Sequence, residues 1–454
     1  IWDYIDQGIM TKDRYGREYI AFGGDFDDRP TDYNFCINGL VYADRRPSPK
    51  MQEVKFLYQD FKLYPSEDSV RIKNESLFTN TSKFDLEWKL RRDGRVILKG
   101  SLNCDVAPQS QETIELPIPK QVIGGEYAVD VSLVLKEPEK WADTGHEVAF
   151  GQYVYVVGEE VQERPKLPIQ VEDCKSNIGV KGRDFHAIFS RPYGSIISLK
   201  YAGKEMIDSP LMPNFWRAPT DNDRGNNMPH RSAQWKIASL YAKNTDVELK
   251  QGDYSATITY TYELPTTPKA YCKVSYTVYG DGEIKVNMNY DGYSQLPDMP
   301  AFGMTFKIPA DYENLEWYGN GPEETYSDRR HGARVGIFKN KVVDNVADYV
   351  IPQECGNKTD IRWAKVIDNR GFGIEILGDG DIEFSALPYT SHELENAFHH
   401  YELPPIHHTV INVYKRQMGV GGDDSWGALP HPEYLIPSDG PMELEFSIRA
   451  TENA

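Results

Sequence analysis

The 454-residue sequence has little cysteine, no long apolar run and no excess of basic residues. Its five cysteines include no Cys-x-x-Cys pair, so they indicate neither a zinc site nor a dense disulfide framework, and the sequence predicts free thiols, with a single disulfide bridge as the alternative. No window reaches the roughly 18 apolar residues that a membrane-spanning helix needs, and we expect no membrane partner. The 50 basic residues are outnumbered by 69 acidic ones, which gives a net charge of -19. Nucleic acid is excluded as a partner because nothing supplies a positive surface for phosphates.

The residues that are present suit packed β structure. Hydrophobic residues make up 40% of the sequence and aromatic residues 12%, and the length suits two to four domains. Apolar and polar side chains alternate over residues 127–135, on both sides of the turn Asp93-Gly94, and over 272–278 and 284–290. Such alternation is typical of half-buried strands joined in hairpins. The sequence therefore predicts a mainly β fold of antiparallel sandwiches.

Two stretches have the spacing of a helix. Residues 49–61 carry apolar side chains at helical intervals after Pro49, a favourable first residue. Residues 391–398 follow Thr390, which together with Glu393 has the spacing of a capping box. We expect helices at these two places.

Two punctuated segments indicate domain boundaries. Residues 45–50 contain two prolines, and residues 158–168 (GEEVQERPKLP) are charged and proline-rich, as linkers often are. The division predicts four segments, at residues 1–45, 46–160, 161–170 (a linker) and 171–454.

The first 45 residues have the composition expected near the end of a barrel strand. Residues 1–7 predict a buried strand, and residues 22–28 (FGGDFDD) predict a loop dense in glycine, aspartate and aromatic residues. Barrel enzymes place their sites at such strand ends; a surface loop is the competing interpretation. Because natural proteins seldom begin inside a strand, we expect the sequence to be a piece of a longer protein, and it indicates no compartment.

Six segments together resemble the family 2 glycoside hydrolases, specifically the long β-galactosidases of the enterobacterial type. They are IWDYIDQG, FGGDFDDRPTDYNFCINGLVYADRRPSPKMQEVK, NFWRAPTDNDRG, WYGNGPEETYSDR, YVIPQECGNKTDIRW and MGVGGDDSW. They follow the family's order and span residue 1 to about 426. The resemblance implies a C-terminal portion of such an enzyme: the end of a (β/α)8 barrel (1–45), an immunoglobulin-like β-sandwich (46–160) and a large terminal antiparallel β-sandwich (171–454).

The resemblance also implies which residues face the sugar. Trp2 matches a barrel tryptophan that packs against galactose, since a flat apolar ring covers the C–H face of a sugar. Asn38 matches an asparagine that binds galactosyl hydroxyls, and Trp426 matches a platform for the leaving-group sugar. The loop that borders the same pocket is matched by Arg217, Asp221, Asn222, Asp223 and Gly225.

For cofactors, the resemblance implies sodium and magnesium. The backbone carbonyl of Phe35 and the side chain of Asn38 match two sodium ligands, and oxygen atoms suit such a hard cation. The family's remaining protein ligand for sodium is an upstream carboxylate, and its magnesium ligands are also upstream. We therefore expect a partial sodium site and no magnesium site in this chain.

No catalytic residue is implied within the chain. Retaining glycosidases need two carboxylates about 5–5.5 Å apart, and in this family both glutamates precede the first residue of this sequence. The full-length enzyme, which we expect to be a homo-oligomer, acts on terminal β-D-galactosyl residues, whereas this chain alone is expected to be inactive. The alternatives are a non-catalytic carbohydrate-binding or adhesion module, and a hydrolase with its own carboxylate pair.

Two further expectations concern side chains outside these roles. Without the rest of a barrel, the aromatic residues Trp2, Phe22, Phe26 and Phe35 are expected to be exposed. The adjacent histidines at 399–400 and at 407–408 are interpreted as structural or surface residues, because neighbours in a strand point to opposite faces.

Overall fold

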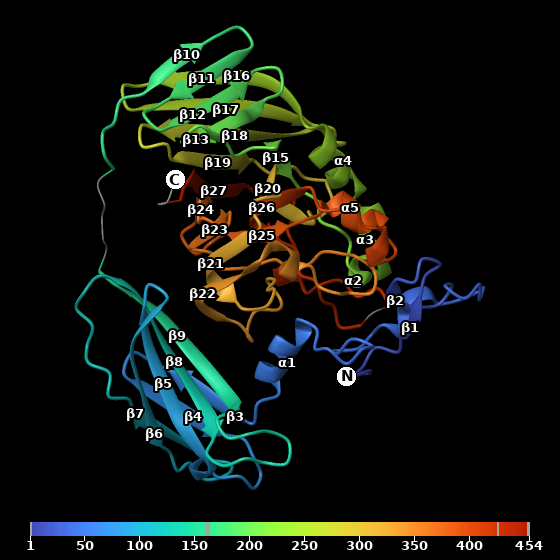
Figure 1. Cartoon of the computed structure of the whole chain (residues 1–454), viewed down its shortest axis with the longest axis vertical. Coiled ribbons are helices and arrows are strands. Elements are labelled where there is room, and N and C mark those ends of the chain that lie inside the picture. Colours follow the sequence, from blue (N-terminus) through green and yellow to red (C-terminus); the bar gives the residue numbers. More distant parts are fainter. Residues whose placement is uncertain (1, 159–163, 425, 452–454) are drawn as a thin grey trace. The chain divides into compact units, whose positions relative to one another are not determined.

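The computed structural model of the chain (Figure 1) describes residues 2–158, 164–424 and 426–451. The protein is mainly β with several antiparallel sheets, which confirms the predicted fold class. Its contacts divide it into a larger unit (residues 1–51, 165–330 and 338–454) and a smaller unit (52–164 and 331–337). No helix within the described residues is long and apolar enough to cross a membrane. The boundary predicted at residue 45 stays a prediction, and the predicted linker lies partly outside the described residues.

The smaller unit is a seven-stranded sandwich of the immunoglobulin type. One sheet has the order β3-β4-β7, at Phe61–Pro65, Ser69–Asn74 and Gln111–Glu115. The other has the order β6-β5-β8-β9, at Arg95–Asn103, Phe84–Arg92, Gly125–Leu135 and Glu147–Val157. The alternating apolar residues form its core, among them Val70, Leu86 and Leu133, each 0% exposed. Three strands facing four are typical of this fold.

Three antiparallel sheets form the core of the larger unit among the described residues. A five-stranded sheet runs from β10 to β14, at Gln170–Asp173, Asn177–Lys181, Phe185–Ser190, Ser195–Tyr201 and Lys204–Glu205. A four-stranded sheet has the order β15-β20-β26-β25, at Ser209–Asn214, Ala301–Pro309, His408–Gln417 and Glu383–Leu387. One buried core cluster joins all three sheets and includes Trp235, Tyr276 and Trp317.

The third sheet of this unit has nine strands. Its order is β16-β17-β18-β19-β27-β24-β23-β21-β22, at Lys243–Gln251, Ser255–Leu264, Ala270–Tyr279, Ile284–Tyr290, Met442–Ala450, Gly373–Leu377, Trp363–Ile367, Asn314–Gly321 and Arg334–Lys341. Strand β27 comes from the end of the chain and lies between β19 and β24 (Figure 1). It therefore joins the two halves of the sheet.

The helices are short and few. The helix predicted at 49–61 is shorter in the structure, α1 (Lys50–Leu57), because Phe61 begins strand β3. The second prediction is confirmed by α5 (Ser391–Asn396) and its capping box of Thr390 and Glu393. Three helices were not predicted, namely α2 (Asp221–Gly225), α3 (Met228–Arg231) and α4 (Ala233–Tyr241). The prediction of free thiols is confirmed for all five cysteines.

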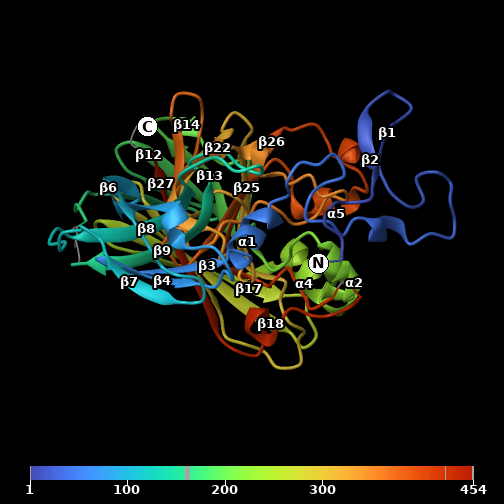
Figure 2. The ribbon, with the colours of Figure 1, turned by 90° about the horizontal axis from the view of Figure 1, so that it is seen from below.

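The N-terminal segment belongs to the larger unit, and its described residues do not form the strand predicted at residues 1–7. Within residues 2–7 only Ile5 forms a β-bridge, an isolated parallel one to Val41. A segment that lacks neighbouring strands does not form a regular strand, because its backbone groups must find other hydrogen-bond partners. Strands β1 (Ile9–Lys12) and β2 (Glu18–Ala21) form a hairpin that lies at the edge of the unit in Figures 1 and 2.

The exposure expected for four aromatic residues of this segment holds for three of them. Trp2 is 91% exposed, and Phe26 and Phe35 are also exposed. The expectation for Phe22 is wrong, because this ring is buried against Val350 and Ile351 of its own unit. The larger unit therefore supplies packing partners to part of the segment.

Candidate functional site

An open cleft of about 670 Å³ lies in the larger unit. This volume falls within the range of about 300–1,000 Å³ that is typical of small-molecule sites. Four stretches of sequence meet there. The first two line the cleft with Trp2, Asp32, Asn34, Phe35, Ile37, Asn38, Leu40 and Lys50, and with Thr220, Asp221, Asn222, Arg224 and Gly225. The third supplies Glu324, Tyr326, Arg329, Tyr349, Gln353 and Glu354, and the fourth supplies Val420, Gly422 and Asp424. Of the residues implied to face the sugar or border its pocket, Trp2, Asn38, Asp221, Asn222 and Gly225 line the cleft.

Helix α2 forms one wall of this cleft, where the sequence predicted a loop. The side chain of Thr220 accepts a hydrogen bond from the Asp223 backbone, and Asp223 accepts one from the Thr220 backbone at 3.0 Å. This capping box is why the segment becomes helical. The side chain of Asn222 donates to the Val420 carbonyl at 2.9 Å, which ties the helix to the fourth lining stretch.

Arg217 and Asp223 do not line the cleft but hold α2 from behind. The Arg217 Nε and Nη2 atoms donate to the Asp223 carboxylate at 3.0 and 2.9 Å, and both side chains are almost completely buried. Arg217 also donates to the carbonyls of Met418 and Gly419. Burial alone would lower the pKa of Arg217, but the Asp223 carboxylate raises it above the ordinary value. The guanidinium therefore stays charged and links α2 to the loop that leads to Trp426.

Asp221 joins helix α2 to the N-terminal segment. Its Oδ1 atom accepts a hydrogen bond from the Asn34 amide at 2.7 Å, and its Oδ2 atom accepts one from the Gln353 amide at 2.9 Å. The Gln353 side chain also accepts from the Asp221 backbone at 3.1 Å. Three of the four lining stretches are therefore connected through one carboxylate.

Trp426 stands at the edge of the cleft on a glycine-rich loop. The Asp328 carboxylate accepts from the backbone of Val420 and Gly421 at 3.1 and 2.8 Å and so fixes the start of the loop. The Asp424 carboxylate accepts from the Trp426 backbone at 2.9 Å. The indole ring is 74% exposed and its centre lies 6.1 Å from that of Phe35. Trp426 does not itself line the cleft but is presented to solvent beside the ring of Phe35, which does.

Phe35 and Asn38, the two implied sodium ligands, lie in contact. The Asn38 amide nitrogen donates to the Phe35 carbonyl oxygen, next to the short helix η1 (Tyr33–Cys36). The two groups fit a cation site in part, because turning the amide about its terminal bond brings its oxygen beside the carbonyl oxygen. Two oxygens are fewer than a hard cation needs, and their role as sodium ligands stays a prediction.

The wall of the cleft that contains Glu324 is charged. The Glu324 carboxylate accepts hydrogen bonds from Arg329, from the Tyr349 hydroxyl at 2.5 Å and from the Gly356 backbone at 2.7 Å. Lys50 donates to the Gly39 carbonyl at 2.6 Å, and burial lowers its pKa. This wall is a fixed set of charges and hydrogen-bonding groups facing an open cleft.

Glu354 lies in the same wall and is buried. Burial raises the pKa of its carboxyl to about 7, although the Gln417 amide donates to it at 3.0 Å. A raised pKa in the folded state means that the folded chain binds more protons than the unfolded chain between the ordinary value of 4.5 and about 7. The free energy of unfolding therefore falls as the pH rises through this window.

We expect Glu354→Gln to remove this part of the pH dependence. Relative to the unchanged chain, the variant should gain roughly 2–3 kcal/mol in unfolding free energy between pH 5 and pH 8, since one pKa unit corresponds to about 1.4 kcal/mol. Urea unfolding at a series of pH values measures this difference. Glu248→Gln, at an exposed position, is the control and should show no such trend. If the difference in unfolding free energy between Glu354→Gln and the unchanged chain did not change with pH, the raised pKa of Glu354 would be contradicted.

Several residues of this wall were not predicted as site residues. Glu324, Arg329, Tyr349 and Glu354 belong to two of the quoted segments, WYGNGPEETYSDR and YVIPQECGNKTDIRW, but the sequence assigned them no role. The available signal was the density of charged and aromatic residues in those segments. Glu324 and Arg329 are five residues apart in one loop, but their contact with Tyr349 depends on how that loop folds against a second one.

Exposed tryptophan rings in and beside an open cleft that amide and carboxylate groups also line are typical of carbohydrate-binding sites, since sugars have apolar C–H faces and polar hydroxyls. Comparison with known families supports this class. Residues 181–448 match the family described as beta galactosidase small chain, residues 70–155 match beta-galactosidase domain 4, and residues 1–63 match the TIM barrel domain of glycosyl hydrolases family 2. The chain belongs to the family 2 β-galactosidases and corresponds to their C-terminal portion.

Individual relatives agree with this family. The chain is 49% identical to a β-galactosidase of Halalkalibacterium halodurans, over 99% of this chain and 45% of the relative. It is 40% identical to that of Streptococcus thermophilus and 37% identical to that of Priestia megaterium, in each case over 99% of this chain and 44% of the relative. The chain thus spans less than half the length of these relatives.

Proposed function

We propose that this chain forms the sugar-facing platform and scaffold of a retaining β-galactosidase that hydrolyses terminal, non-reducing β-D-galactosyl residues. Trp2 and Asn38 contact the galactosyl group, and Trp426 supports the leaving-group sugar. The acid/base and nucleophile glutamates belong to the part of the enzyme that precedes this sequence, so the chain alone is inactive. The observation that carries the proposal is the cleft that brings Trp2 and Asn38 together with α2 and with the loop that holds Trp426.

The proposal includes the cofactors. Phe35 and Asn38 provide two of the oxygen ligands of a sodium ion, and a carboxylate from the preceding part of the enzyme completes the site. The contact between the Asn38 amide and the Phe35 carbonyl supports this assignment. Bound sodium would orient a galactosyl hydroxyl. The magnesium ligands lie in the preceding part of the enzyme. The full-length enzyme assembles as a homo-oligomer, and light scattering can check this oligomeric state.

The platform can be tested in the chain joined to the preceding half of the Halalkalibacterium halodurans relative. We expect Trp2→Ala to lower kcat/KM for a β-galactoside by at least about 30-fold, the effect of losing about 2 kcal/mol at a buried aromatic contact. Trp426→Ala should raise KM for disaccharides more than for a galactoside with a small leaving group. Steady-state kinetics with the two substrates separate these effects.

The matched control for both variants is Tyr15→Ala. Tyr15 is 69% exposed, lies in the same N-terminal segment as Trp2 and does not line the cleft. Its replacement should leave both kinetic constants unchanged. Equal kcat/KM values for Trp2→Ala and Tyr15→Ala would reject the platform. Tight galactose binding by the chain alone would favour a carbohydrate-binding module instead.

A further inference from the structure

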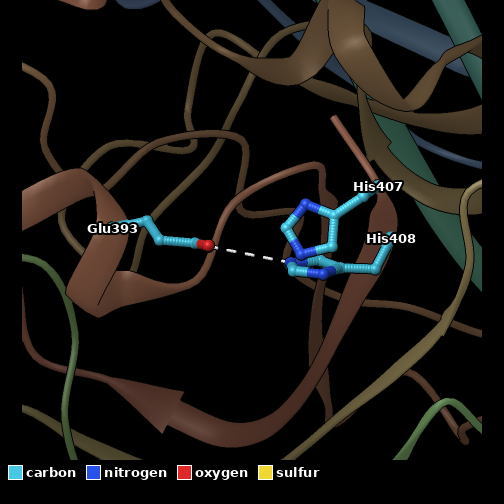
Figure 3. Close-up of side chains that lie close together, drawn as sticks. All are labelled: Glu393, His407 and His408. Carbon is cyan, nitrogen blue, oxygen red and sulfur yellow. Dashed lines mark ion pairs between the residues drawn. The ribbon is translucent and has the colours of Figure 1, made fainter. Parts of the chain in front are cut away.

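Three side chains outside the cleft converge where α5 faces the start of β26. Glu393, His407 and His408 each offer a ligand atom, and these atoms lie within 4.8 Å of one another. Figure 3 shows Glu393 reaching from its helix toward the two imidazole rings. The ring centres of the two histidines are only 4.0 Å apart. The expectation that these neighbours diverge is wrong, because β26 begins at His408 and His407 precedes the regular strand.

The hydrogen bonds around this cluster leave ring nitrogens available. The Nε2 atom of His408 is buried and, among the described residues, has no hydrogen-bond partner. It lies 3.7 Å from Glu393 Oε2. The Nδ1 atom of His407 lies 3.0 Å from the Pro405 carbonyl, and a proton on Nδ1 that bonds to this oxygen leaves Nε2 unprotonated. Histidines that ligate metals are commonly oriented by such a bond from the other ring nitrogen.

The Glu393 carboxylate is also held in place. Its Oε2 atom accepts hydrogen bonds from the backbone and the hydroxyl of Thr390 at 2.7 and 2.8 Å. A buried imidazole nitrogen without a partner is costly, and an ion that binds it removes that cost. The positive charge of Lys307 and the negative charge of Asp208 have opposite electrostatic effects on the His408 imidazole, so the two effects partly cancel.

We propose that Glu393, His407 and His408 bind a divalent transition-metal ion of the zinc type. Two imidazole nitrogens and one carboxylate oxygen form a ligand set found in zinc sites, with water as the fourth ligand. Ligand atoms about 2.0–2.1 Å from a tetrahedral zinc ion lie about 3.3 Å apart, so the 3.7 Å between His408 and Glu393 needs only a small closure. Exposed His407 gives the ion access from solvent.

Such an ion would brace a segment that contacts the N-terminal part of the chain. Glu393 and His407 lie on either side of residues 394–406, which include His399 and Tyr401. His399 Nε2 lies 2.9 Å from the Asp25 carboxylate, and the rings of His399 and Tyr401 pack on Tyr19. The metal would therefore stabilise the contact that holds β2 and the following loop to the rest of the larger unit.

Zinc titration of the chain by calorimetry tests the proposal. A Cys174→Ser background removes the exposed thiol, which is a competing ligand. One zinc ion should bind per chain, and His407→Ala should weaken zinc binding by at least about 100-fold. Losing a residue that only hydrogen-bonds to a metal ligand typically costs about 10–100-fold, so a larger loss indicates a direct ligand. Glu393→Gln should also weaken binding while keeping the helix cap, since glutamine serves in a capping box. Circular dichroism checks that both variants fold.

The matched control is His431→Ala. His431 lies 2.8 Å from Asp423 and 3.9 Å from Glu433, so it combines an imidazole with two carboxylates but lacks a second histidine. Its loss should leave zinc affinity unchanged, and magnesium should not compete with zinc, because magnesium prefers oxygen ligands. A cobalt-substituted chain should show tetrahedral absorption that His407→Ala abolishes. The proposal is overturned if folded His407→Ala and Glu393→Gln bind zinc like the unchanged chain, or if about a tenfold molar excess of zinc gives no uptake by the unchanged chain.

Discussion

The isolated 454-residue chain is expected to hydrolyse a chromogenic β-galactoside no faster than buffer does. A retaining mechanism needs a nucleophilic carboxylate and an acid/base carboxylate about 5–5.5 Å apart across the bond. Two carboxylates in the charged wall of the cleft are engaged otherwise: Glu324 accepts hydrogen bonds from Arg329 and Tyr349, and Glu354 accepts one from Gln417. One missing acid/base group alone costs about 10²–10⁴-fold, so the rate should lie at least about 10⁴-fold below that of a complete relative.

The Halalkalibacterium halodurans β-galactosidase, assayed under the same conditions, is the positive control. Intact-mass measurement must give 51.8 kDa for the chain, so that a contaminating full-length enzyme is detected. Turnover by a homogeneous chain within about 10²-fold of the relative would contradict the account. If Glu324→Gln or Glu354→Gln then abolished that turnover, a carboxylate pair in this cleft would be responsible.

Replacing Asp223 by alanine is expected to lower the free energy of unfolding of the larger unit by about 3–5 kcal/mol. The change leaves the fully buried guanidinium of Arg217 without its carboxylate and removes half of the capping box of α2. An uncompensated buried charge is among the most costly single defects in a folded protein. Urea unfolding can be followed by tryptophan fluorescence, because Trp216, next to Arg217, is buried.

Asp184→Ala is the matched control for this stability prediction. Asp184 is also paired with an arginine, Arg183, at 3.7 Å, but the two side chains are 81% and 93% exposed. Exposed pairs contribute about 0–1 kcal/mol, so this variant should unfold close to the unchanged chain. Asp223→Asn should fall between the two, because it keeps a capping oxygen but loses the charge. Equal midpoints for Asp223→Ala and Asp184→Ala would show that Arg217 does not depend on Asp223.

The strands could be predicted well because each carries its own signal. The alternation at 127–135 and the pair 272–278 and 284–290 correspond to β8, β18 and β19. Short helices carry a weaker signal. Helix α2 has five residues, too few for helical periodicity, and its capping box uses aspartate where glutamate or glutamine is usual. The N-terminal residues were misjudged for another reason, since a strand depends on neighbours that its own sequence does not encode.

The cleft could be predicted only in part. Trp2, Asn38 and the segment around Asp221 were proposed from the family resemblance, and these residues line one cleft. The resemblance placed Arg217 and Asp223 in the loop that borders the pocket, but that they pair and support the wall from behind could not be inferred, because burial of the pair is not encoded in the sequence pattern. Likewise, the rule for adjacent strand residues failed at His407, because it assumed that the strand had already begun. Long-range packing decided the first of these cases, and the local start of β26 decided the second.

Covalent trapping tests the central claim most directly. An activated 2-deoxy-2-fluoro-β-galactoside glycosylates the nucleophile of a retaining enzyme and leaves a stable glycosyl-enzyme. The complete Halalkalibacterium halodurans enzyme should gain the mass of one glycosyl group, whereas the 454-residue chain should stay at 51.8 kDa. A glycosyl adduct on any carboxylate of the chain, found by peptide mapping, would show that it carries its own nucleophile and contradict the account.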